Sequence, residues 1–231
     1  MFLIVILVVF AIVSFSVQRR LKNKFKKYSQ VALSSQLSGK EAAEKMLKDN
    51  GIYDVKVMSV GGQLTDHYNP ANKTVNLSAE VYGHRSAAAV AIAAHEVGHA
   101  VQHAKAYAFL ELRSALVPIQ NVSAKIINFV FMAMLFGAFA LPQLINPQLA
   151  LLVIIGCYTV FTLFALITLP VEFDASKRGL AWMTTSGVAT TREHDMAKDA
   201  LKWAAMTYVV AALASLVTLL YYVSLFLGSR D

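Results

Sequence analysis

The feature that most constrains this chain is a long segment without charge: from Ile126 to Val171 it contains no Asp, Glu, Lys or Arg. Such a segment has room for two apolar helices of about 20 residues each, the length that spans a bilayer. Of the 231 residues, 57% are hydrophobic and 15% are charged. Soluble domains carry about 25% charged residues. The pattern therefore excludes an ordinary soluble enzyme and also a disordered chain.

Four apolar segments are predicted to cross the membrane. The first, Phe2–Val17, lacks the basic start and the small-residue cleavage site of a signal peptide, so we interpret it as an uncleaved anchor. The uncharged segment is interpreted as a hairpin of Ile126–Leu141 and Leu149–Leu169, with a turn at Pro142–Pro147. Trp203–Leu227 is the fourth span. For the hairpin, the alternatives are a buried helix pair in a soluble protein and a re-entrant loop.

The basic residues indicate how the spans are oriented. Gln18–Lys125 contains 15 of the 21 Lys and Arg residues and Glu172–Lys202 contains five more, whereas the hairpin turn contains none. Because basic loops stay in the cytoplasm, both segments are predicted to be cytoplasmic, with the N-terminus outside. The run Arg19–Lys27 follows the first span directly and fits the anionic head groups of the lipid bilayer. No nucleic-acid partner is predicted, because the sequence contains no recognisable binding module.

The first cytoplasmic segment is predicted to contain both helices and strands. Ser38–Glu41 matches a capping box that opens a helix with apolar residues on one face. Tyr53–Met58 and Lys73–Ser78 alternate polar and apolar residues, which is typical of strands. Ser86–Ala106 is rich in Ala and contains no Pro, which predicts a long helix with Ser86 as its N-cap.

That long helix contains His95-Glu96-Val97-Gly98-His99, a match to the pattern H-E-x-x-H. Residues four apart lie on one face of a helix, about 6 Å apart along its axis, so both imidazoles can converge on one ion. Glu96 is rotated by about 100° from His95, which places it beside the ion as a general base. His95 and Glu96 also interrupt an apolar run, a costly place for polar groups without a partner. The pattern predicts a zinc site.

A catalytic zinc ion usually has three protein ligands, so a third is required. His103 lies about 12 Å from His95 along a straight helix and cannot join both other imidazoles, and Glu111 lies further along the chain. Glu172 is the first ionisable residue after the third span, and Pro170 is predicted to open a helix that holds it near the membrane surface. Spacing therefore favours Glu172, with a solvated carboxylate at a helix start as the alternative.

A resemblance to a known family rests on four segments: His95–Gln102, Leu169–Ser176, Gly62–Pro70 and Val75–Ser78. They resemble the YugP-type neutral zinc metallopeptidases, a bacterial family of membrane proteases. The resemblance covers nearly the whole chain. The order of the segments is also similar to that of the broader HtpX and CAAX-processing protease group.

The resemblance implies a membrane gluzincin with Zn²⁺ as its cofactor. In this sequence His95, His99 and Glu172 would be the zinc ligands and Glu96 the general base. The implied fold class is an α+β zincin-like minimal catalytic domain. It is joined to a mainly α-helical, multi-pass membrane portion with four transmembrane helices.

Two further roles are left open by the sequence. In the HtpX pattern an Asp follows the ligand Glu by four residues; here that position is Ser176, and Asp174 lies two residues earlier. Either residue is a candidate to orient a ligand imidazole. A donor for the charged oxygen of the transition state is also required, and the candidates are His194, Tyr68 and His67. Each of these three is equally interpretable as a capped turn residue or a core aromatic.

The function predicted is a zinc-dependent endopeptidase that cleaves membrane or membrane-adjacent proteins at the cytoplasmic face of the bacterial plasma membrane. Zinc polarises the scissile carbonyl, and Glu96 moves a proton from water to the leaving amine. The resemblance supports Lys73–Ser78 as an edge on which an extended substrate adds by backbone pairing, with an ordinary internal strand as the alternative. The second hypothesis is a non-catalytic, zinc-stabilised membrane scaffold that recruits partner proteins, which has no need of Glu96. Membrane-protein partners and a homo-oligomer are both compatible with the sequence.

These predictions divide the chain into five segments. They are residues 1–17, the first transmembrane helix; 18–125, the cytoplasmic catalytic domain; 126–171, the transmembrane hairpin; 172–202, the cytoplasmic segment with the third ligand; and 203–231, the fourth transmembrane helix and a short tail.

Overall fold

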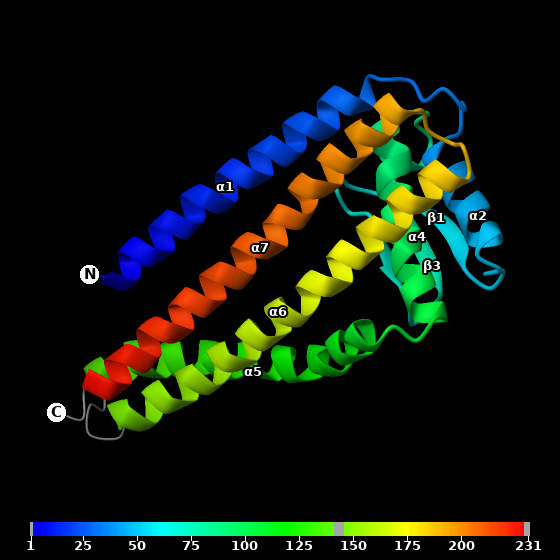
Figure 1. Cartoon of the computed structure of the whole chain (residues 1–231). Coiled ribbons are helices and arrows are strands. Elements are labelled where there is room, and N and C mark those ends of the chain that lie inside the picture. The colour runs from blue at the N-terminus through cyan, green and yellow to red at the C-terminus, as the bar shows by residue number, and fades with distance from the viewer. Residues whose placement is uncertain (1, 141–145, 229–231) are drawn as a thin grey trace. The chain divides into compact units, whose positions relative to one another are not determined.

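The computed structural model describes residues 2–140 and 146–228. Along these residues the elements are α1 (Phe2–Ser29), α2 (Gly39–Asp49), β1 (Lys56–Val60), β2 (His67–Asn69), β3 (Thr74–Ser78), α3 (Ala79–Tyr82), α4 (Ala87–Ala104), α5 (Ala108–Ala140), α6 (Pro147–Thr185) and α7 (Thr191–Gly228) (Figure 1). They divide into two compact units. The apolar unit comprises residues 1–14, 112–168 and 208–231, and the polar unit comprises residues 15–111 and 169–207.

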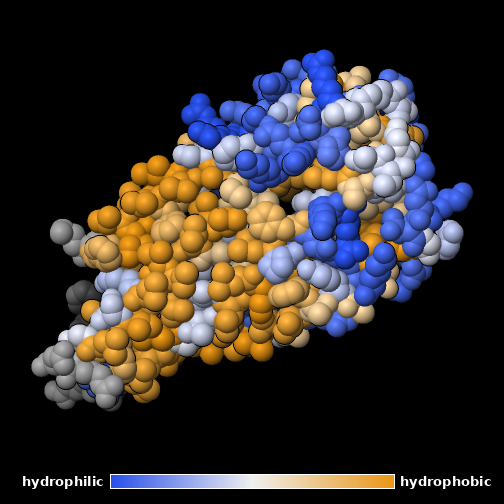
Figure 2. Space-filling model, in the orientation of Figure 1, coloured by the Kyte–Doolittle hydropathy of each residue, from blue (hydrophilic) through white to orange (hydrophobic). Residues whose placement is uncertain are grey.

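The apolar unit consists of parts of α1, α5, α6 and α7. All four helices are long and apolar enough to cross a membrane, and only 6% to 22% of each most apolar window is buried. Large side chains such as Phe129 and Leu135 are exposed as a result. On the face drawn in Figure 2, the surface of these helices is almost continuously hydrophobic. A bilayer removes such a surface from water, so the prediction of four apolar helices of spanning length is confirmed. The predicted hairpin turn falls largely on residues 141–145, which lie outside the described residues.

Helix α6 corrects the prediction for Pro170. This residue was expected to open a helix, but it lies inside α6, which continues from Pro147 to Thr185. A proline within a helix removes one backbone hydrogen bond, a loss that helices in membrane proteins tolerate when their surroundings satisfy the freed carbonyl. Glu172 is therefore positioned by a continuous helix and not by a helix start.

The core of the polar unit forms between α2 and α4. Helix α2 begins as predicted with a capping box: the Ser38 N–H donates to the Glu41 carboxylate at 2.7 Å, and the Glu41 N–H donates to Ser38 Oγ at 3.3 Å. The face of α2 predicted to be apolar is buried, with Ala42, Ala43, Met46 and Leu47 inside. Eight of the 18 residues of α4 are Ala, whose small side chains let neighbouring elements approach the helix backbone closely.

The sheet of the polar unit has the order β1-β3-β2. Strand β3 pairs with β1 in parallel, Lys56 opposite Thr74, and with β2 in antiparallel, Tyr68 opposite Val75. Because β3 is the central strand, the expectation that Lys73–Ser78 presents an edge is wrong, and β2 is an outer strand that contacts α4. Strand β1 begins three residues later than predicted, where the Lys56 N–H donates to the Lys73 carbonyl.

Candidate metal centre

Helix α4 places the two histidines of the H-E-x-x-H segment on one face. Its N-terminus is capped as predicted, because Ser86 Oγ accepts a hydrogen bond from the Ala89 N–H at 3.2 Å. The rings of His95 and His99 are one turn apart, with centroids separated by 4.8 Å and planes at 82°. Their side chains are 13% and 10% exposed, so the helix presents both imidazoles to the interior of the polar unit.

Glu172 reaches both imidazoles from α6. Its Oε2 lies 3.3 Å from His95 Nε2 and 3.6 Å from His99 Nε2, and the residue is 2% exposed. The ligand atoms of the three residues all lie within 4.8 Å of one another, which makes them a possible metal site. Burial disfavours a charge on His99, but the Glu172 and Glu96 carboxylates and the hydrogen bond to Gln102 together outweigh burial and raise the pKa of the imidazole.

The spacing of these atoms fits a zinc ion. Zinc binds imidazole nitrogen and carboxylate oxygen at about 2.0–2.2 Å in tetrahedral geometry, which places two ligand atoms about 3.4 Å apart. The distances of 3.3 Å and 3.6 Å from the Glu172 oxygen to the two imidazole nitrogens agree with that value. A donor set of two imidazoles and one carboxylate is also typical of catalytic zinc, which keeps a fourth position for water or substrate.

Two glycines allow α4 and α6 to approach closely enough for this cluster. A Cβ on Gly98 of α4 would lie 2.5 Å from the carbonyl oxygen of Ala175, and a Cβ on Gly179 of α6 would lie 2.9 Å from the carbonyl of Ala94. Both distances are far below ordinary van der Waals contact. The two backbones therefore touch on both sides of the site only because these side chains are absent.

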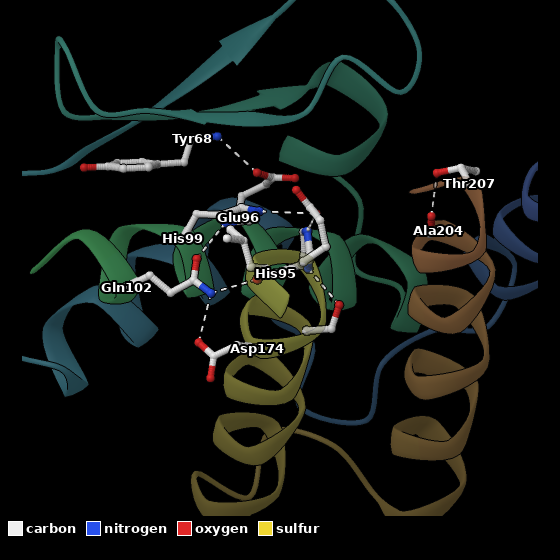
Figure 3. A network of polar contacts seen from close by, with 11 residues as sticks. Tyr68, His95, Glu96, His99, Gln102, Asp174, Ala204 and Thr207 are labelled. Atoms are coloured by element: carbon white, nitrogen blue, oxygen red, sulfur yellow. Dashed lines mark hydrogen bonds and ion pairs between the residues drawn. The ribbon is translucent and has the colours of Figure 1, made fainter. Parts of the chain in front are cut away.

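Each of the two imidazoles has a partner on its other nitrogen. His95 Nδ1 lies 3.0 Å from Ser176 Oγ, and His99 Nδ1 lies 3.0 Å from Gln102 Oε1. Asp174 does not contact His99 directly but accepts a hydrogen bond from Gln102 Nε2 at 2.9 Å. The two residues left open by the sequence thus serve different imidazoles, as Figure 3 illustrates for the Gln102–Asp174 side. Gln102 was not predicted as a site residue. Its position three residues after His99, on the same face of a helix, is the signal for it.

Glu96 lies beside the cluster and is held by the edge of the sheet. Its Oε2 accepts a hydrogen bond from the backbone N–H of Tyr68 in β2 at 3.0 Å, and the residue is 8% exposed (Figure 3). The Tyr68 hydroxyl lies 2.8 Å from His103 Nδ1. Burial raises the pKa of this hydroxyl, so Tyr68 stays protonated at neutral pH. Tyr68 therefore touches the site through its backbone, while its hydroxyl is engaged with His103.

The other two donor candidates have different surroundings. His67 is exposed, and its Nδ1 lies 2.8 Å from the carbonyl oxygen of Thr65. His194 is in the first turn of α7, where its backbone N–H donates to the Thr190 carbonyl. Neither belongs to the cluster of metal-ligating groups found among the described residues.

Comparison with known proteins identifies the family. Residues 3–227 match the family described as "Putative neutral zinc metallopeptidase". The chain belongs to this family. It is also 42% identical over 219 residues to a protein of Bacillus subtilis (strain 168) named "Putative membrane protease YugP", and the match covers 94% of this chain and 93% of that protein. The resemblance noted in the sequence is confirmed.

Membership in this zinc metallopeptidase family supports zinc as the metal and peptide hydrolysis as the activity. The roles of His95, Glu96, His99 and Glu172 in that chemistry stay predictions. No solved structure matches the chain, and the zincin-like description of the catalytic domain likewise stays a prediction.

Proposed function

We propose that this chain is a zinc-dependent endopeptidase of the plasma membrane in which His95, His99 and Glu172 hold the zinc ion. The observation that carries the proposal is the convergence of these three side chains, from two helices, at distances that suit tetrahedral zinc. The family of zinc metallopeptidases to which the chain belongs supports the same chemistry.

When bound, zinc lowers the pKa of a water molecule and polarises the carbonyl of the scissile peptide. Glu96 is the general base: it accepts the proton of the attacking water and delivers that proton to the leaving amine. The hydrogen bond from the Tyr68 N–H holds one carboxylate oxygen of Glu96, which fixes the direction of the other. Burial of Glu96 and the ligands limits access of bulk water to the reacting groups.

The substrate is an extended polypeptide that adds to the outer edge of β2. This strand takes the place that the sequence assigned to β3, because β3 is paired on both sides. The N–H of Tyr68 points from β2 to Glu96, so a peptide laid along this edge would pass the proposed base. The relative named as a membrane protease supports polypeptide substrates and a location at the membrane.

The substitution Glu96→Gln tests the mechanism. The amide introduced at this position keeps the size of the side chain but cannot accept the water proton. We therefore expect unchanged zinc content and a loss of peptidase activity of about 10²–10⁴-fold. The full-length protein in detergent is assayed against an unstructured protein such as casein, with metal analysis in parallel. Glu80→Gln, the same change at an exposed carboxylate of α3, is the matched control.

Two results would contradict the proposal. A Glu96→Gln variant as active as the parent would exclude Glu96 as the base. A parent protein that binds no zinc would exclude the metal site. The scaffold hypothesis predicts instead that the parent binds zinc without cleaving any polypeptide, since a structural site has no use for a base.

The cytoplasmic orientation of the site is part of the same proposal and rests on the distribution of basic residues. It is tested with single cysteines at two exposed positions, Ser35→Cys near α2 and Gln148→Cys at the start of α6. The natural Cys157 is buried, so the parent is a low-background control. A membrane-impermeant maleimide added to intact cells should label the Gln148→Cys variant and not the Ser35→Cys variant. The reverse pattern would place the site outside the cell.

A further inference from the structure

Gln102 is a fully buried side chain at the centre of a hydrogen-bonding network. It follows His99 by three residues on α4, and its exposed fraction is 0%. Its Oε1 lies 3.0 Å from His99 Nδ1, and its Nε2 donates to the Val171 carbonyl at 2.8 Å and to Asp174 Oδ2 at 2.9 Å. Figure 3 shows the carboxamide between the ring of His99 and the carboxylate of Asp174. Both ends of the side-chain amide are therefore engaged.

The chemistry of these partners fixes the direction of every hydrogen bond in the network. A backbone carbonyl and a carboxylate can only accept, so the end of Gln102 that faces Val171 and Asp174 must be the NH₂ group. The end that faces His99 is then the carbonyl oxygen, which also can only accept. His99 Nδ1 must carry the proton that is donated. A neutral imidazole has a single N–H, so a proton on Nδ1 leaves the lone pair of Nε2 available to a metal ion on the side of Glu172.

Arg178 prevents the amide of Gln102 from turning over. Its Nε donates to Asp174 Oδ2 at 2.5 Å, one turn along α6, and its guanidinium lies 5.7 Å from the centre of the Tyr107 ring. This contact holds the Asp174 carboxylate in place. A reversed Gln102 would direct its oxygen at both the Asp174 carboxylate and the Val171 carbonyl, two repulsive contacts in a buried site.

Among the described residues, the imidazole of His95 has no partner that fixes which of its nitrogens carries the proton. His95 Nδ1 lies 3.0 Å from the hydroxyl of Ser176, which can either donate or accept. The hydroxyl orients the ring without deciding which of its nitrogens carries the proton. The two histidines therefore differ in what their partners impose on them.

We propose that Gln102 is a positioning residue that holds His99 with Nδ1 protonated and Nε2 free to bind the metal, and that Asp174 and Arg178 hold Gln102 in that orientation. The inference rests on the proposed zinc site, since its purpose is to prepare His99 as a ligand. The hydrogen-bond polarity itself is a property of the metal-free chain and is measured separately.

The first experiment examines the metal-free, full-length protein in detergent by nitrogen NMR of ¹⁵N-labelled histidine side chains, at a pH where imidazoles are neutral. The His99 signals are assigned by their loss in His99→Asn. We expect His99 to carry its proton on Nδ1. An Nδ1 that carries no proton would overturn the proposal whether or not the protein is a peptidase. This measurement needs no change at Gln102, so it decides the matter even if variants at that position fail to fold.

The second experiment compares zinc affinity in two variants by competition with a chromophoric chelator. Gln102→Leu keeps the volume of the side chain but removes the acceptor, and we expect zinc to bind about 10–100-fold more weakly. In nitrogen NMR of this variant, the proton of a neutral His99 should no longer be held on Nδ1. Ser176→Ala is the matched control, because it removes the hydrogen bond of the other imidazole, and we expect a smaller effect. Equal losses in the two variants, or parental affinity in Gln102→Leu, would overturn the special role of Gln102.

Discussion

The close contact between α4 and α6 predicts that Gly98→Ala weakens zinc binding without touching a ligand. The added Cβ would lie 2.5 Å from the Ala175 carbonyl oxygen, and that oxygen belongs to the backbone of α6. A Cβ essentially never lies closer than 3.0 Å to another heavy atom and ordinary contact begins at 3.4 Å, so the two backbones must separate by roughly 0.5–0.9 Å. His99 is adjacent to Gly98 on α4, whereas Glu172 lies on α6, so the separation also moves the ligands apart.

The size of this movement decides the outcome. Zinc–ligand distances tolerate deviations of only about 0.2 Å, which is less than the required separation. We therefore expect zinc affinity to fall by about tenfold or more, equivalent to about 1.4 kcal/mol. Overpacking a core in this way also costs about 1–3 kcal/mol of folding stability. Zinc affinity is measured by chelator competition, and stability by thermal unfolding of the solubilised protein with and without zinc.

Gly156→Ala is the matched control for this experiment. Gly156 is also in α6, but a Cβ there meets nothing within 4 Å. Gly156→Ala should leave zinc affinity at the parental value, because it adds the same methyl group without a clash. If Gly98→Ala bound zinc as tightly as Gly156→Ala and unfolded at the parental temperature, the argument that backbone contact sets the ligand spacing would be refuted.

Two further predictions concern the proposed third ligand and a half-buried carboxyl outside the site. Glu172→Ala should weaken zinc binding by more than about 100-fold, because losing a partner outside the ligand set already costs about 10–100-fold. In thermal unfolding, a chelator should lower the Tm of the parent and leave that of Glu172→Ala unchanged; equal shifts would exclude Glu172 as a ligand. Burial raises the pKa of Asp66, although its carboxylate accepts a hydrogen bond from the Ser78 N–H. Its contribution to stability is therefore present below its ordinary pKa and is lost as the pH rises through the raised value. Asp66→Asn keeps the hydrogen-bond acceptor and should make the free energy of unfolding depend less on pH in that window. If chemical denaturation gave the same change of this free energy with pH as in the parent, the prediction would be contradicted.

Local patterns in the sequence were sufficient to predict several elements of the structure. The capping box at Ser38 and the N-cap at Ser86 are formed within one turn of helix, so their residues alone specify them. The histidines of α4 share a face because helix geometry requires it. The apolar helices of spanning length also follow from composition along a single segment.

Two of the features that the sequence misassigned or missed, the place of β3 in the sheet and the role of Gln102, depend on contacts between distant segments. Whether β3 is an edge or a central strand is decided by β2, which has three residues and gives little signal of its own. Pro170 was interpreted as a helix start because Pro is common at the first position of a helix, but no stop signal separates it from the apolar run before it, and the helix continues. The role of Gln102 becomes visible only when α6 supplies Val171 and Asp174 as acceptors.

The charges of the site explain why it suits a divalent cation. Glu96 and Glu172 are both buried, and each carries a negative charge when ionised. The nearby charge of Asp174 is compensated by its ion pair with Arg178 within α6. Two carboxylates that share a buried site disfavour one another. A divalent cation between the imidazoles and Glu172 neutralises both carboxylates at once, whereas a monovalent cation would leave one charge uncompensated. In the metal-free chain the same negative charge attracts protons, which agrees with the raised pKa of His99. Metal binding and proton release are therefore coupled at this site, since the same two carboxylates attract both the ion and the protons.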